Sequence, residues 1–192
     1  MKEKTCILGL DIGTTSAKVV AFDRKRRVIA RAQAELQLLS ENQWQAEQDP
    51  DAVYETVIAK MVQVISDVCQ QGYDVQMVGF SAAMHSIFMV SEGNAPLCNA
   101  LTWMDGRAHK EAEDFWQEES GRSLYRRTGT PIHAMAPLLK LMWLQKHRFP
   151  QFQRTAKFVS LKEWVWHKWF REWHIDVRCR SNEPASYRPC QR

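Results

Sequence analysis

The chain has 192 residues, of which 45% are hydrophobic and 25% charged, and its formal net charge is +4. These values are typical of one soluble globular domain of about 100–200 residues, and they exclude wholesale disorder. The whole chain has 26 Lys and Arg and 22 Asp and Glu, and residues 178–192 hold four Arg and one Glu of these. Positions 1–177 therefore carry 22 basic and 21 acidic residues, so the body of the chain is almost neutral.

The first forty residues predict three strands. Cys6–Leu10 and Ala17–Phe22 are short apolar runs, separated by a turn rich in glycine and hydroxyl side chains. Val28–Glu35 alternates polar and apolar residues in the manner of a half-buried strand. We expect the second and third strands to form a hairpin, with the first strand beside it.

A long amphipathic helix follows these strands. Asp49 is a typical N-cap and Pro50 a typical first helical residue, and apolar residues then recur at three- and four-residue spacing as far as Gln71. Gly72 is expected to end the helix. The next predicted elements are strands at Val75–Phe80 and Ile87–Val90, a Gly93-Asn94 turn and an apolar stretch at Leu97–Trp103.

The second half of the chain predicts mainly helices. In order, these elements are a helix at Ala108–Glu119 closed by Gly121, a helix from Pro137, a short helix after Pro150, a strand at Lys157–Ser160 and a helix at Leu161–Trp173. The aromatic residues of the last helix predict one core-facing stripe: Trp166, Trp169, Phe170 and Trp173. The alternation of strands and helices predicts an α/β domain.

The first candidate site is the turn Asp11-Ile-Gly-Thr-Thr-Ser16, at the end of the first predicted strand. A glycine turn offers backbone N–H groups to phosphate oxygens, and neighbouring hydroxyls add further donors. The carboxylate of Asp11 could hold a magnesium ion through water, and Lys18 could add a positive charge. The alternative is an Asx or Ser/Thr turn that satisfies only its own backbone, and composition alone leaves both open.

Two further segments combine polar and aromatic side chains. Small residues around His85 in Ser81–Ser86 would let a ligand approach the backbone, although a tight connection with a satisfied histidine explains them too. Trp103, Asp105 and Arg107 offer a ring face, a carboxylate and a guanidinium for a polyol, because carbohydrates stack on aromatic rings and need fixed polar groups. The alternative is a helix capped by Asp105, with Arg107 in a surface ion pair.

Several classes of protein are disfavoured. Five widely spaced cysteines without a C-x-x-C pair argue against a disulfide framework or a zinc site, and they indicate a reducing cytoplasm. Neither a secretory signal nor an apolar run of about 18 residues occurs, so we expect no membrane partner. Basic residues do not interleave with the eight tryptophans, so we expect no nucleic-acid partner either.

Five segments in a fixed order carry a resemblance to a known family. They are Leu8–Lys18, Val78–Ser86, Leu101–Arg107, Tyr125–His133 and Leu161–Trp164. Over residues 5 to about 177 the sequence resembles the N-terminal domain of the FGGY carbohydrate kinases, and within that family the gluconate kinases most closely. The resemblance implies an RNase H-like α/β fold, related to actin and hexokinase, and transfer of the γ-phosphoryl group of ATP to a hydroxyl of a small sugar acid or polyol.

The resemblance also implies roles for residues of this sequence. Asp11 would organise Mg²⁺ through water. The ATP phosphates would be contacted by Gly13, Thr14, Thr15 and Ser16, with Lys18 nearby. The sugar site would comprise Met84 and His85, with Trp103, Asp105 and Arg107 as further members.

Two departures from the family pattern shape the remaining expectations. The family's catalytic aspartate and its second, ATP-gripping domain would follow the point at which this chain stops, so no catalytic base is assigned. We expect residues 1–177 to be an incomplete N-terminal domain, and residues 178–192 an unstructured basic tail produced by a frame change. The resulting prediction is an inactive gluconate kinase fragment; the alternatives are a non-catalytic sugar-binding or partner module, or a kinase of another polyol such as xylulose.

Overall fold

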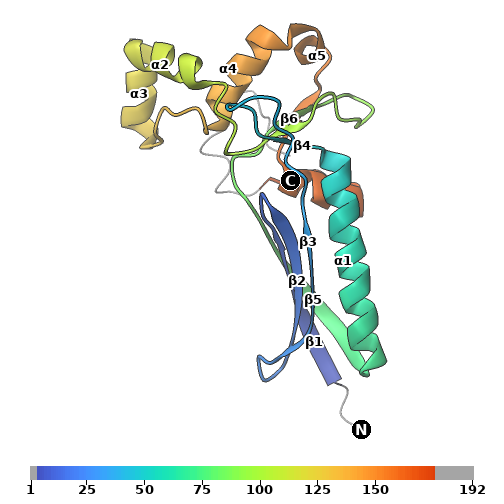
Figure 1. The fold of residues 1–192 in the computed structure, drawn as a ribbon. Coiled ribbons are helices and arrows are strands. Elements are labelled where there is room, and N and C mark those ends of the chain that lie inside the picture. Colours follow the sequence, from blue (N-terminus) through green and yellow to red (C-terminus); the bar gives the residue numbers. More distant parts are fainter. Residues whose placement is uncertain (1–3, 176–192) are drawn as a thin grey trace. The chain divides into compact units, whose positions relative to one another are not determined.

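The computed structural model describes residues 4–175, so the predicted basic tail at 178–192 lies outside the described residues. The chain divides into two compact units (Figure 1). Unit 1 comprises Met1–Leu38 and Gln48–Ala83, and unit 2 comprises Leu39–Glu47 and Met84–Arg192. Each unit is described by itself.

Unit 1 is a four-stranded mixed sheet with one long helix. The strand order is β3-β2-β1-β5, in which β1 runs antiparallel to β2 and parallel to β5. Its elements are β1 (Lys4–Ile12), β2 (Ser16–Asp23), β3 (Val28–Glu35), α1 (Pro50–Gln70) and β5 (Tyr73–Ala82). The predicted hairpin and the adjacent first strand are confirmed.

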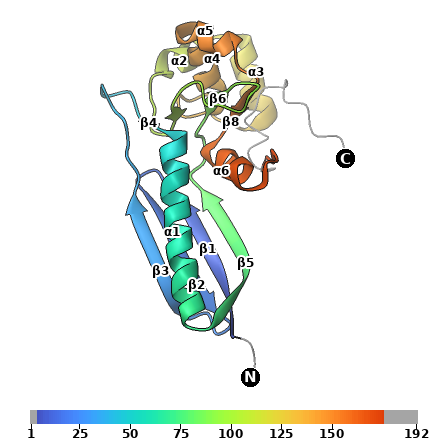
Figure 2. The ribbon, with the colours of Figure 1, turned by 90° about the vertical axis from the view of Figure 1, so that its right-hand side faces the viewer.

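Helix α1 covers one face of this sheet (Figure 2). Its buried residues include Val57 and Val64, and alternate residues of β1 such as Leu8 and Leu10 are buried as well. On the other face, Ile7 pairs in register with Phe22 and Met77. Ile7 is 49% exposed and Met77 65% exposed, so apolar side chains remain accessible on that face.

The ends of α1 follow the predicted capping signals. The side chain of Asp49 accepts hydrogen bonds from the backbone N–H groups of Asp51 and Ala52, at 2.8 and 3.1 Å. Gly72, at φ 76°, follows the last turn in a left-handed conformation that suits a residue without a Cβ. Both predicted boundaries of this helix are confirmed to within one residue.

Unit 2 consists of short strand pairs and five helices within the described residues. Strand β4 pairs with β7, and β6 pairs antiparallel with β8. The elements are β4 (Glu47–Gln48), of which only Glu47 belongs to unit 2, β6 (Phe88–Val90), β7 (Ala100–Leu101), α2 (His109–Gln117), α3 (Glu119–Thr128), α4 (Pro137–His147), α5 (Phe149–Gln153), β8 (Lys157–Val159) and α6 (Leu161–Phe170). One of its apolar clusters contains Ile87, Met89, Leu101, Leu141 and Leu144.

Gly121 does not end a helix, and that prediction was wrong. The chain turns a corner at Glu118 between α2 and α3, and Gly121 lies inside α3. A Cβ atom on Gly121 would lie 1.9 Å from the carbonyl oxygen of Phe115, so the glycine permits a close approach of the two helices. Helix α3 ends instead at Gly129, whose φ is 69°.

The predicted aromatic stripe of the last helix was also wrong. Helix α6 ends at Phe170, which is 54% exposed, and the fully buried side chains are those of Trp164 and Val165. Trp166 and Trp169 are only partly buried. The buried face is fixed by the start of the helix at Ser160 and by packing onto Phe88, whose ring meets that of Trp164 edge-on.

Ser160 closes a capping box at the start of α6, which gives a first testable prediction. Its Oγ accepts from the N–H of Glu163 at 3.3 Å, and the Glu163 carboxylate accepts from the N–H of Ser160 at 2.6 Å. Ser160→Ala is expected to lower the free energy of unfolding by about 1 kcal/mol. Urea unfolding followed by circular dichroism measures it, and Ser66→Ala on the exposed face of α1 is the control; equal effects of both changes would contradict the prediction.

Candidate functional site

The turn between β1 and β2 is tight and depends on its glycine. The N–H of Gly13 donates to the carbonyl oxygen of Ser16 at 2.9 Å. A Cβ atom on Gly13 would lie 3.0 Å from the same oxygen, closer than side chains normally approach a backbone carbonyl. The sequence places glycine here because only its small size lets the turn close over so few residues.

Two flanking contacts within unit 1 hold the turn in place. The amide of Gln48, which is 1% exposed, donates from Nε2 to the carbonyl oxygen of Thr14 at 2.9 Å. The N–H of Leu36 donates to the carbonyl oxygen of Thr15, also at 2.9 Å. Sequence reasoning missed Gln48; a polar residue directly before the Asp49-Pro50 helix start was the available signal.

The charged residues predicted at this turn share one face of the sheet. Asp11 and Lys18 are directly opposite each other on β1 and β2, and Ser81 of β5 is the neighbour of Asp11 on its other side. All three are exposed. A carboxylate, an amine and a hydroxyl therefore form a cross-strand row beside the glycine turn, on the face that α1 does not cover.

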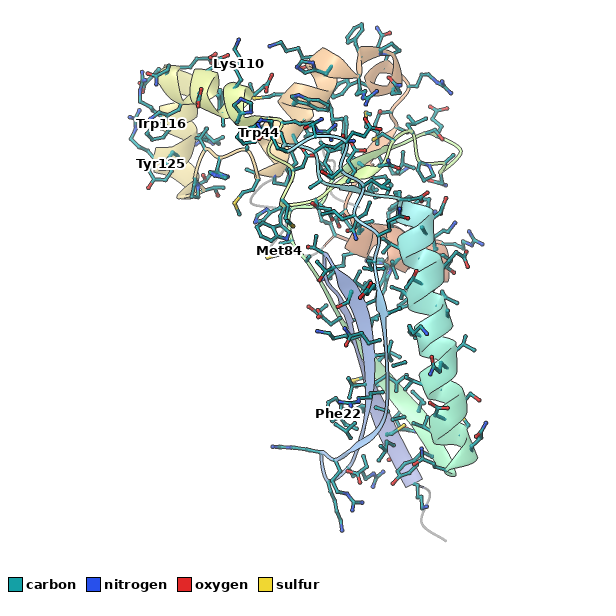
Figure 3. All side chains as sticks on the ribbon, in the orientation of Figure 1. Phe22, Trp44, Met84, Lys110, Trp116 and Tyr125 are labelled. Atoms are coloured by element: carbon teal, nitrogen blue, oxygen red, sulfur yellow. The ribbon has the colours of Figure 1, made fainter. Side chains whose placement is uncertain are left out.

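In unit 2, the predicted sugar residues Met84 and His85 precede β6. Met84 is 48% exposed (Figure 3). His85 adopts φ 66°, a left-handed conformation that is uncommon for a residue with a side chain and is often found at functional sites. Burial lowers the pKa of His85, and the nearby Lys140 ammonium lowers it further, so the imidazole is neutral at pH 7.

A fully buried lysine joins the two predicted sugar segments. Lys140 of α4 is 0% exposed, and its Nζ donates to the carbonyl oxygen of His85 at 2.8 Å and to that of Thr102 at 2.7 Å. Burial lowers the pKa of Lys140 to about 7, although the Asp105 carboxylate acts in the opposite direction. Sequence reasoning missed this residue; a single lysine within the apolar run of α4 was the available signal.

Asp105 and Arg107 form a buried ion network with Glu47. The side chain of Asp105 is 0% exposed and accepts from Arg107 Nε at 3.0 Å and from the N–H of Ala46 at 3.0 Å. The Arg107 guanidinium, 11% exposed, also pairs with Glu47 and lies 4.3 Å from the ring centroid of Trp143. Both carboxylates that pair with Arg107, those of Asp105 and Glu47, are buried.

This network overturns the capping alternative for the segment. The N-cap of α2 is Ala108, and no side chain caps the helix. The alternative interpretation was a helix capped by Asp105, with Arg107 in a surface ion pair. The ion pair of Arg107 is buried instead. Contact of Asp105 and Arg107 with a sugar stays a prediction; their described contacts hold the loop that carries Trp103.

Two exposed tryptophans flank this network. Trp103 is 46% exposed and Trp44 is 48% exposed. Trp44 is labelled in Figure 3. The Trp44 ring stacks on His109 at a centroid distance of 4.9 Å, and a Cβ on Gly106 would lie 3.0 Å from the Trp44 ring. Sequence reasoning did not identify Trp44 as a candidate, because it is distant in the chain from the segment it covers.

The predicted residues therefore separate into two groups. The residues assigned to the nucleotide lie in unit 1, and those assigned to the sugar lie in unit 2. Among residues 4–175, no group of three or more His, Cys, Asp or Glu side chains could hold a metal ion. No helix within the same residues is long and apolar enough to cross a membrane.

The sequence of the chain matches a known protein family and is similar to individual known proteins. Residues 6–182 match the family model for the FGGY family of carbohydrate kinases, N-terminal domain. The chain is 37% identical over 177 residues to a gluconokinase of Bacillus licheniformis, covering 91% of this chain and 34% of the relative. It is 28% identical over 165 residues to a xylulose kinase of Staphylococcus epidermidis, covering 84% of this chain and 32% of the relative.

A solved structure agrees with these relatives. The gluconate kinase from Lactobacillus acidophilus superimposes with a TM-score of 0.77 at 29% identity, over 86% of this chain and 33% of that one. The chain thus spans about a third of the length of the proteins it matches.

Proposed function

This chain belongs to the FGGY family of carbohydrate kinases, and we propose that it forms the N-terminal domain for transfer of the ATP γ-phosphoryl group to a hydroxyl of gluconate. The predicted RNase H-like fold class is confirmed, because the mixed sheet and its helices superimpose on a kinase of this family. The observation that carries the proposal is the 37% identity to a gluconokinase over 91% of the chain.

The turn of unit 1 suits the phosphates of a nucleotide. Asp11 presents an exposed carboxylate, and Lys18 opposite it presents an exposed amine. A single carboxylate without further protein ligands fits Mg²⁺, which keeps several waters and is shared with substrate phosphates. Bound there, Mg·ATP would supply the phosphoryl group, while Asp11 holds the hydrated cation and Lys18 offsets phosphate charge. Gly13 and the hydroxyls of Thr14, Thr15 and Ser16 would orient the phosphate oxygens.

Gluconate is favoured over xylulose as the sugar. The identity to the gluconokinase is 37%, against 28% to the xylulose kinase, and the aligned region includes the proposed sugar residues. The exposed Met84 side chain and Trp103 ring offer apolar surface, and the neutral His85 imidazole can exchange hydrogen bonds with hydroxyl groups. These features support a polyol ligand.

We further propose that the 192 residues by themselves do not turn over substrate. Phosphoryl transfer depends on positioning and on neutralising charge, and a third of the length of the relatives offers only part of those groups. Sugar binding without turnover is the state expected of this segment.

Two measurements on the purified 192-residue chain test the proposal. Calorimetric titration with gluconate, xylulose and glycerol is expected to show binding of gluconate and weaker or no binding of the other two. An ADP-release assay with ATP, Mg²⁺ and gluconate is expected to show no turnover above a protein-free blank. Preference for xylulose would reassign the substrate, and turnover at a rate of about 10 per second, ordinary for an enzyme, would refute the inactivity of the segment.

A further inference from the structure

We infer that Lys140 is a positioning residue for sugar selection: its amine ties together the two loops that present His85 and Trp103. The inference rests on the proposed function, because those loops are the proposed sugar site.

The contacts of Lys140 are specific to the two loops. Its Nζ bonds the carbonyl oxygen of His85, 55 positions earlier in the chain, and that of Thr102, 38 positions earlier. Thr102 directly precedes Trp103, so each carbonyl belongs to a proposed sugar residue or to its neighbour. Lys140 is fully buried, and its neighbours in the helix, Leu139 and Leu141, are buried as well. At such a position a lysine has no packing advantage over a methionine.

The backbone at both ends of this link is already constrained. His85 is held at φ 66°, a conformation that needs support from surrounding structure. Thr102 is 2% exposed, and its N–H and Oγ both donate to the carbonyl oxygen of Ala46 at 2.9 Å. Lys140 thus connects a strained histidine to a rigid loop, which fixes the separation of the imidazole and the indole.

The link does not depend on the charge of the amine. An ammonium has three N–H donors and a neutral amine has two, and two carbonyls accept from Lys140. The lysine therefore acts through geometry, by keeping the two loops in one arrangement. If that arrangement falls to a tenth of the population, the apparent affinity for the sugar falls about tenfold.

The test compares Lys140→Met with Lys110→Met in the 192-residue chain. Methionine keeps an unbranched apolar stem and removes the donors. Lys110 is an exposed lysine of α2 (Figure 3) and serves as the matched control. Lys140→Met is expected to weaken gluconate binding about tenfold in calorimetry, with the urea midpoint at pH 7 kept or raised; Lys110→Met is expected to change neither.

Hydrogen exchange gives a readout that needs no ligand. The amides of Ile87 and Leu101, which bond each other's carbonyls at 3.0 and 2.9 Å, are expected to exchange about tenfold faster in Lys140→Met, while those of α1 stay unchanged. A lysine with a merely structural role would speed exchange throughout unit 2 and lower the urea midpoint, and that result overturns the inference.

The two proposals fail in distinguishable ways. Absence of gluconate binding by the wild-type chain contradicts the proposed function, and the exchange data then decide on Lys140 alone. Wild-type binding that Lys140→Met leaves intact overturns the inference and preserves the proposed function.

Discussion

The free energy of unfolding of the wild-type chain is expected to rise relative to that of Lys140→Met by up to about 1.4 kcal/mol per pH unit between pH 7 and pH 10. Burial lowers the pKa of Lys140 to about 7 in the folded chain, whereas a lysine in the unfolded chain titrates near 10.4. Between these values the unfolded chain binds a proton that the folded chain does not. Raising the pH makes binding of that proton less favourable and so destabilises the unfolded chain. The free energy of unfolding therefore increases.

Between the two pKa values the total change in the free energy of unfolding is about 4–5 kcal/mol, and the difference curve levels off about one pH unit below 7 and about one unit above 10.4. The other charged groups that act on Lys140 are the Asp105 carboxylate, which raises its pKa, and the Arg107 guanidinium, which lowers it. His85 is already neutral there because its own pKa is lowered.

Urea unfolding at half-unit pH steps measures the effect. Subtracting the free energy of unfolding of the variant from that of the wild-type chain at each pH cancels the titration of every group that the two chains share. The exposed Lys110→Met control is expected to give a difference curve that does not change with pH over the same range. A flat curve for Lys140→Met as well would show that the buried amine titrates normally.

Asp105→Asn is expected to lower the free energy of unfolding by about 3–5 kcal/mol. The Asp105 side chain is 0% exposed and lies 2.8 Å from the Arg107 guanidinium, which is 11% exposed. The asparagine removes the negative charge and turns an amide N–H₂ toward a group that only donates hydrogen bonds. Arg107 is then left with Glu47 as its one remaining carboxylate among these contacts.

A double-mutant cycle separates this network from simple loss of a side chain. Arg107→Met removes the buried cation, so Asp105→Asn combined with Arg107→Met is expected to cost clearly less than the sum of the single changes. Asp114→Asn, on the exposed face of α2, is the control and is expected to stay within about 0.5 kcal/mol of wild type. Additive single effects, or an Asp105→Asn cost no larger than the control, would contradict the network.

The elements predicted most accurately are those whose signals are local. The Asp49-Pro50 start of α1 and the strands around the glycine turn depend on residues within a few positions of each other, and both are found as expected. Gly121 shows where local reasoning fails. Its neighbours suggest a helix end, but the glycine is required by the approach of Phe115 from another helix.

In the candidate site, too, the positions of residues with local signals were predicted, and those of residues held by distant segments were not. Asp11 and Lys18 were expected together because they flank one turn, and the register of β1 and β2 places them opposite each other. Asp105 was expected at a helix cap or in contact with sugar. Asp105 instead accepts a hydrogen bond from the N–H of Ala46, which lies 59 residues earlier, and no local pattern reveals that contact.

The near-neutral body, the ordered motifs and the kinase family were determined by the sequence itself, since composition and short motifs are written into consecutive residues. The tertiary structure alone decided that Lys140 is a buried link between two loops and that Arg107 is the centre of an ion network. The physical reason is that burial and pairing depend on groups brought together from distant parts of the chain. A lysine in an apolar helix has the same local sequence whether its amine reaches solvent or two backbone carbonyls.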